Sequence, residues 1–111
     1  MTRIAIIGSG IAGLRVAGAL TGSAEVVIFE KSRGHGGRLA TRRAAPFRFD
    51  HGAQFFTVRS DAFRRWLAPL VAEGVIACWH ARFAELGAGP GGARRLWSDA
   101  VPHYVGVPGM S

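Results

Sequence analysis

The chain has 111 residues, enough for one small domain with a modest hydrophobic core. Its 49% apolar and 19% charged residues exclude a disordered chain. The net charge of +7 comes almost entirely from arginine, since Lys31 is the only lysine. The arginines are dispersed and lack an interleaved aromatic platform, so we expect no nucleic-acid partner.

The cysteine and histidine residues bear on the redox compartment of the protein and on metal binding. Cys78 is the only cysteine, so no disulfide can form within the chain, and a reducing compartment is compatible. The four histidines are separated in sequence and give no metal-ligand spacing. No apolar run approaches membrane-spanning length and no signal-peptide pattern is present, so we expect a cytoplasmic protein without a membrane partner.

The first predicted element is a strand at residues 3–7, an apolar run typical of a strand buried on both faces of a parallel sheet. It leads into Gly8-Ser9-Gly10-Ile11-Ala12-Gly13. In this pattern the first glycine permits a tight turn, the second lets the backbone approach a pyrophosphate, and the third lets a helix pack on the strand. We expect that helix to run from Ile11 to about Leu20, with its N-terminus facing a phosphate.

A second apolar run predicts a strand at residues 25–30, parallel to the first strand and with Glu30 at its carboxyl end. An acid at this strand end accepts hydrogen bonds from the adenosine ribose hydroxyls of a dinucleotide. It also disfavours a 2′-phosphate in the same pocket, because the two negative charges would repel each other. The alternative is a solvated carboxylate at the end of a strand.

A third signal follows within eight residues, at Gly36-Gly37-Arg38. Paired glycines bring a second stretch of backbone close to the pyrophosphate, and Arg38 adds a charge-assisted contact. The alternative is a flexible loop with a surface arginine. Because a nicotinamide dinucleotide site needs only the first glycine loop and the acid, this third signal favours FAD over NAD.

Residues 30–38 resemble the second motif of the glutathione-reductase-type flavoproteins in their amine-oxidase-like branch. With residues 39–43, 49–57 and 104–111 included, the chain resembles the renalase-like FAD-dependent oxidoreductases over nearly its whole length. The resemblance implies that FAD accepts a hydride from a small-molecule substrate, a dihydronicotinamide dinucleotide or an amine, and is reoxidised by oxygen to give hydrogen peroxide. It assigns no acid–base catalyst in this chain.

The resemblance also implies which residues line the FAD. Position 12 carries alanine where a hydroxyl residue can occur in the family, so a side-chain phosphate contact is lost while the backbone contact remains. The expected cofactor-binding residues are Gly8, Gly10, Ile11, Ala12, Gly13, Glu30, Lys31, Gly37, Arg38, Ala53, Gln54 and Phe55.

The segment Asp50-His51-Gly52-Ala53-Gln54 puts small residues between polar ones, which suits backbone that passes close to a flat ring. Gln54 can hydrogen-bond the edge of a heterocycle, and Phe55 or Phe56 can cover a face. The alternative is a polar turn between two strands. We expect His51 to be a turn histidine without a chemical role.

Beyond residue 57 the pattern predicts core elements. Ser60 and Asp61 are expected to cap a helix that Gly74 ends. The apolar residues at helical spacing, expected in the core, are Phe63, Trp66, Leu67, Leu70 and Val71. The strands expected after it are residues 75–79, 81–86, 95–97 and 103–105, with a glycine-rich irregular loop at 87–92.

These elements predict an α/β fold. Residues 1–74 form a Rossmann-like βαβ dinucleotide-binding region with parallel strands, and residues 75–111 begin a mixed or antiparallel substrate-binding region. Because residues 107–111 look like a turn that leads into a helix capped by Ser111, we expect the N-terminal part of a longer oxidoreductase, inactive without its C-terminal part.

That expectation includes an incompletely packed second region, with exposed apolar side chains at Val75, Ile76, Trp79, Leu96 and Trp97. Two other functions stay open at this point. One is a nicotinamide-dependent Rossmann oxidoreductase, and the other is a basic binding module without catalysis.

Overall fold

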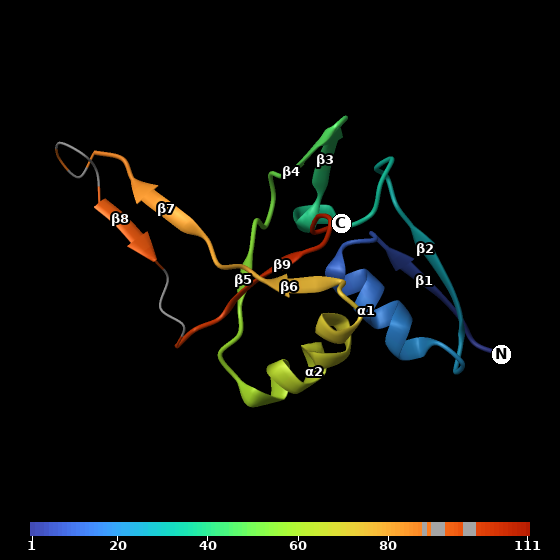
Figure 1. The fold of residues 1–111 in the computed structure, drawn as a ribbon. Helices are drawn as coiled ribbons and strands as arrows, with labels where there is room; N and C mark the ends of the chain where they lie inside the picture. Colours follow the sequence, from blue (N-terminus) through green and yellow to red (C-terminus); the bar gives the residue numbers. More distant parts are fainter. Residues whose placement is uncertain (88, 90–92, 97–99) are drawn as a thin grey trace. The chain divides into compact units, whose positions relative to one another are not determined.

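The computed structural model describes residues 1–87, 89, 93–96 and 100–111, which divide into two compact units. The first unit contains residues 1–54 and 108–111, and the second contains residues 55–107. Among the described residues, helices and strands are mixed along the chain and one strand pair is parallel, which agrees with the predicted α/β content (Figure 1). The division into a cofactor region and a substrate region at residue 74 stays a prediction.

In the first unit, β1 (Arg3–Ile7) and β2 (Glu25–Phe29) form a parallel pair, with α1 (Ile11–Leu20) between them in the chain (Figure 1). The register runs from Arg3 opposite Glu25 to Ile7 opposite Phe29. An ion pair of 3.0 Å joins Arg3 and Glu25 on the first rung. The predicted parallel pairing and the predicted helix are therefore confirmed.

The prediction that β1 and β2 are buried on both faces is wrong. The half-buried side chains of the two strands are Ile4, Ile6, Val26 and Ile28. Ile6 lies on the face that α1 covers, since a Cβ at Gly13 would meet its Cγ2 atom at 3.2 Å. On the other face Ile7 is 83% exposed and Phe29 56% exposed, because no second layer of this unit's described residues covers it.

The chain then passes through η1 (Gly37–Leu39), a single 3₁₀ turn, into an antiparallel hairpin of β3 (Thr41–Ala44) and β4 (Phe47–Asp50). Thr41 pairs with Asp50 at the open end of the hairpin, and Ala44 pairs with Phe47 at its tip. Only Ala40 separates the end of the 3₁₀ turn from Thr41, so the open end of the hairpin is joined closely to the second glycine loop.

The second unit contains a three-stranded antiparallel sheet in the order β5–β9–β6. Its strands are β5 (Phe56–Thr57), β6 (Ile76–Cys78) and β9 (His103–Gly106). A further hairpin pairs β7 (Arg82–Glu85) with β8 (Ala93–Leu96). Antiparallel strands therefore follow the parallel pair along the chain, and the predicted loop at 87–92 lies largely outside the described residues.

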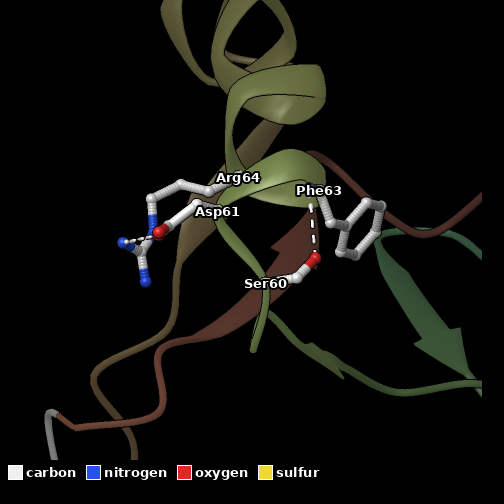
Figure 2. Close-up of polar contacts among 4 residues, drawn as sticks. All are labelled: Ser60, Asp61, Phe63 and Arg64. Carbon is white, nitrogen blue, oxygen red and sulfur yellow. Dashed lines mark hydrogen bonds and ion pairs between the residues drawn. The ribbon is translucent and has the colours of Figure 1, made fainter.

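Helix α2 (Asp61–Ala72) of the second unit begins and ends as its sequence predicts. The Oγ atom of Ser60 accepts a hydrogen bond of 3.2 Å from the Phe63 N–H, and Asp61 pairs with Arg64 at 3.2 Å (Figure 2). After the helix, Gly74 has a φ of +71°, in the left-handed region that glycine adopts more readily than other residues. The Ser60 hydrogen bond satisfies one of the N–H groups of the first helical turn, which have no intrahelical acceptor.

The core of the second unit is small. Among the described residues its buried apolar side chains are Val58, Leu67 and Ile76, with Phe56, Leu70 and Tyr104 packed against them. Phe63, Trp66 and Val71 of α2, expected in the core, are all three exposed, and the rings of Phe63 and Trp66 stack with their centroids 5.9 Å apart. The helical spacing places them beside the buried stripe without a second layer to cover them.

The predicted exposure after residue 74 is confirmed in part. Val75 is 46% exposed and Trp79 39% exposed. The prediction is wrong for Ile76, which is 8% exposed because β6 pairs with β9 and turns this side chain toward the core. The side chain of Leu96 and the whole of Trp97 lie outside the described part of the chain. No described helix is long and apolar enough to cross a membrane.

We predict that Gly13→Ala destabilises the protein by about 1–3 kcal/mol, because the added Cβ would overlap the Gly8 carbonyl oxygen and push α1 away from β1. Gly18→Ala is the matched control in the same helix. Its Cβ would meet only the end of the Arg15 side chain, at 3.9 Å, so stability should rise by about 0.5–1 kcal/mol. Urea unfolding of both variants checks this, and equal midpoints would contradict the predicted close approach.

Candidate functional site

The first glycine loop joins β1 to α1 and leaves its backbone accessible. Gly8 has a φ of +97°, and its N–H donates to the Phe29 carbonyl oxygen at 2.7 Å, which holds the loop against the end of β2. A Cβ at Gly8 or Gly10 would meet no described atom within 4 Å. The space beside the loop is therefore open, and a ligand can approach its backbone.

The first turn of α1 faces the same loop. Gly10 is the N-cap residue, and its carbonyl oxygen accepts from the Leu14 N–H at 3.0 Å. The N–H groups of Ile11, Ala12 and Gly13 have no intrahelical acceptor, and they carry the partial positive charge of the helix N-terminus. Donors arranged in this way suit a phosphate.

The second glycine loop lies directly against the first. The Gly36 N–H donates to the Ser9 carbonyl oxygen at 2.9 Å, and Gly36 forms a parallel bridge with Gly10. Gly36 and Gly37 have φ values of +107° and +56°, and a Cβ at Gly37 would lie 3.3 Å from the Gly10 Cα. Close approach and backbone conformation both favour glycine here, and the two loops form one continuous backbone surface.

A third segment, which follows Asp50 at the open end of the hairpin, joins this surface. The Ala53 N–H donates to the Arg38 carbonyl oxygen at 2.9 Å, and a Cβ at Gly52 would overlap the same oxygen. Residues 51–55 do connect two strands, as the simpler interpretation holds, but they also pass close to the backbone of the second loop. Gly52 therefore has a packing role against the Arg38 carbonyl, which the sequence did not predict.

Glu30 is bound by neighbouring donors. Its Oε2 atom accepts from the Ser9 N–H at 2.7 Å and from the Ser9 Oγ at 2.9 Å, and its Oε1 atom accepts from the Ser32 N–H at 2.8 Å. The Ser9 N–H, followed by the Ser32 N–H, lowers the pKa of Glu30 from 4.5 to about 2. The side chain is therefore a carboxylate throughout the physiological range, which favours hydroxyl donors and repels a 2′-phosphate.

A hollow of about 350 Å³ lies beside Glu30. Leu14 and Ile28 contribute apolar surface, and the rest of its lining is polar or glycine. The lining residues are Ser9, Leu14, Ile28, Glu30, Ser32, Arg33, Gly34 and His35. An apolar wall next to a charged acceptor suits a flat heterocycle attached to a sugar.

Sequence reasoning missed most of these lining residues. Ser9 occupies a variable position of the glycine pattern, yet it is buried and holds both Glu30 and Gly36. The sequence feature that could have identified Ser9 is a short hydroxyl side chain directly after Gly8, the glycine of the tight turn. Ser32 could have been found from its spacing, two residues after the acid.

The structure places the other predicted site residues in two groups. Lys31 and Arg38 are exposed, close in sequence to Glu30 and Gly37 respectively, and Gln54 is an exposed residue of the first unit. Phe55 belongs to the second unit, where its ring centroid lies 5.2 Å from that of His103 and 5.9 Å from that of Trp79. The expectation that Phe55 lines a cofactor stays a prediction.

Comparison with known protein families matches residues 6–70 to the NAD(P)-binding Rossmann-like domain, over more than half of the chain. The chain belongs to this family. It is a dinucleotide-binding domain of the oxidoreductase type. The matched region contains both glycine loops and Glu30, so the coarse prediction of a Rossmann-like dinucleotide-binding protein is confirmed.

We predict a pH-dependent stability difference between the wild type and Glu30→Gln. Because the pKa of Glu30 in the folded state is about 2, its hydrogen bonds stabilise the fold fully above the ordinary pKa of 4.5. This stabilisation is lost as the pH falls from 4.5 toward 2. The variant should therefore have the lower urea midpoint at pH 7, and the difference should shrink toward pH 2.

The control for this measurement is Thr21→Val, which removes the exposed hydroxyl of the C-cap residue of α1, a group that donates to the Ala17 carbonyl oxygen at 3.2 Å. Its difference from the wild type should not follow the same pH curve. A constant gap between wild type and Glu30→Gln from pH 7 to pH 2 would show that the carboxylate is not held by these donors.

Proposed function

We propose that this chain binds FAD, as the FAD-binding portion of a renalase-like flavin-dependent oxidoreductase. The observation that carries the proposal is the parallel bridge between Gly10 and Gly36. It brings Gly37 against the first glycine loop and places Arg38 one residue further along the same turn. Domains of this family occur in FAD-dependent oxidoreductases and amine oxidases.

The residues fit the phosphate and ribose parts of such a cofactor. The Glu30 carboxylate accepts hydrogen bonds from Ser9 and Ser32 and also lines the open hollow, where a ribose hydroxyl can donate to it. The open space beside Gly8 and Gly10 admits a pyrophosphate to the backbone and to the N-terminus of α1. Arg38 is exposed and available to neutralise phosphate charge.

In this proposal each expected residue has a defined task. The first glycine loop and the first turn of α1, from Gly8 to Gly13, hold the pyrophosphate through backbone N–H groups. Glu30 holds the ribose, with Lys31 beside it, while Gly37 and Arg38 cover the phosphates from the other loop. Ala53 and Gln54 of the first unit are the residues proposed to approach the flavin ring.

Bound FAD supplies the ring that accepts a hydride. The proposed hydride donor is a dihydronicotinamide dinucleotide or an amine, with oxygen as the final acceptor. The protein's own contribution is to bind and orient the cofactor, and no side chain of this chain is assigned a proton-transfer role.

A second candidate is a nicotinamide-dependent oxidoreductase, which the description of the family as NAD(P)-binding favours. The first glycine loop and Glu30 would serve an adenosine diphosphate moiety in either cofactor. The charged Glu30 carboxylate selects NAD over NADP in this case, because a 2′-phosphate would be repelled. The second glycine loop would then have no role in binding the nicotinamide cofactor.

We predict that the purified 111-residue chain binds FAD more tightly than NAD, with NADP weakest. Glu30→Ala and Arg38→Ala should each weaken FAD binding roughly tenfold, since each loses a charge-assisted hydrogen bond to the cofactor. Flavin fluorescence and calorimetric titration measure these affinities.

Glu73→Ala and Arg65→Ala are matched controls for this titration, since both residues are exposed and belong to the second unit. They should bind FAD like the wild type. Saturation by NAD without saturation by FAD would favour the second candidate. No binding of either would leave a basic module without a cofactor.

A further inference from the structure

Residues 109–111 lie against the hairpin of the first unit, about 60–70 positions away in sequence, through a compact hydrogen-bond network. The Met110 N–H donates to Asp50 Oδ1 at 3.0 Å, and the Ser111 N–H donates to Thr41 Oγ1 at 3.1 Å. In return the Thr41 N–H donates to Ser111 Oγ at 2.9 Å.

The Thr41 hydroxyl is the centre of this network. It accepts from the Ser111 N–H and donates to Asp50 Oδ1 at 2.5 Å, so both hydrogen-bonding functions of the hydroxyl are used. Asp50 receives both of its bonds on the same oxygen. We call Thr41, Asp50 and residues 109–111 the hairpin lock.

Two glycines let the hairpin lock close. A Cβ at Gly109 would lie 3.0 Å from Thr41 Cγ2 and Oγ1, tighter than an ordinary contact. A Cβ at Gly36 would lie 2.7 Å from Ser111 Cβ, which real structures do not tolerate. Residues 109–111 of the lock therefore contact both the hairpin, at Thr41, and the second glycine loop, at Gly36.

We infer that Thr41 and Asp50 are positioning residues for the second glycine loop. This loop enters at Gly36 and leaves at Ala40, whose N–H donates to the Gly37 carbonyl oxygen at 3.0 Å. Thr41 is the next residue, and Ser111 lies against Gly36, so the lock holds both ends of the loop.

The physical reason is conformational entropy. Consecutive glycines can adopt many backbone conformations in a free chain. A ligand that must order them on binding therefore binds less tightly, because the ordering costs conformational entropy. A loop held in its binding conformation by the lock avoids this loss. The inference rests on the proposed function for its effect on affinity, but the ordering of the loop can be measured without any cofactor.

Paired substitutions in the full 111-residue chain distinguish the loss of these hydrogen bonds from the effect of a change in side-chain size. Thr41→Val keeps the shape and removes both hydroxyl bonds, whereas Thr41→Ser keeps the hydroxyl. Asp50→Ala removes the acceptor, whereas Asp50→Asn retains an Oδ1 that can accept both bonds. Thr21→Val, at the exposed C-cap of α1, is the control for loss of a threonine hydroxyl.

The first measurement is amide hydrogen exchange without cofactor. In Thr41→Val and Asp50→Ala, the hydrogen-bonded amides of Gly36, Leu39 and Ala40 should exchange at least about tenfold faster. The amides of Gly8 and Glu25, which bond within the β1–β2 part, should keep the wild-type rate. Thr41→Ser and Asp50→Asn should stay within about threefold of the wild type at all of these amides.

The second measurement is FAD affinity, which should fall about tenfold in Thr41→Val and Asp50→Ala and recover in Thr41→Ser and Asp50→Asn. Unchanged exchange at Gly36 in both disruptive variants would overturn the inference. Faster exchange with unchanged FAD affinity would overturn it as well, since the lock would then not position the site.

Two further outcomes are distinguishable. If the wild type does not bind FAD, the proposed function fails, and the exchange data alone decide whether the lock orders the loop. If Thr41→Val unfolds, Ser111→Ala tests the same point, because it removes only the acceptor for the Thr41 N–H. Wild-type exchange at Gly36 in Ser111→Ala would then count against the lock.

Discussion

The structure of the first unit depends on one backbone hydrogen bond, from the Gly36 N–H to the Ser9 carbonyl oxygen. This bond holds two loops together that are more than 20 residues apart in sequence. It requires Gly36 and Gly37 at positive φ and brings Gly37 onto the backbone of Gly10. A Cβ at Gly37 would press on the Gly10 backbone and a Cβ at Gly36 would overlap the Ser111 side chain, so the close contact of the two loops depends on these two glycines.

Ser9 couples this backbone contact to the charge of the site. Its carbonyl oxygen receives the second loop, while its N–H and hydroxyl both bind the Glu30 carboxylate. The acid that would meet a ribose is therefore held in its ionised form by the same residue that joins the loops. Loop geometry and electrostatics are therefore linked through one buried serine.

The sequence predicted the local elements well because their causes are local. The helix at 11–20 follows from a glycine turn that starts it, and the helix at 61–72 follows from the Ser60 cap and the Gly74 stop. Parallel pairing of β1 and β2 follows from two short apolar runs joined by a helix. The burial of these elements was predicted less well, since Ile7 and Phe29 are exposed and Ile76 is buried.

What the sequence alone determined is the dinucleotide-binding pattern, since glycine spacing and an acid at a strand end leave few other uses. Only the tertiary structure decided which groups surround that pattern. The contacts of Ser9 with Glu30, of Ala53 with Arg38 and of Ser111 with Thr41 join residues about 15–70 positions apart. Such contacts arise from chain reversal and close backbone approach, and neither leaves a periodic trace in the sequence.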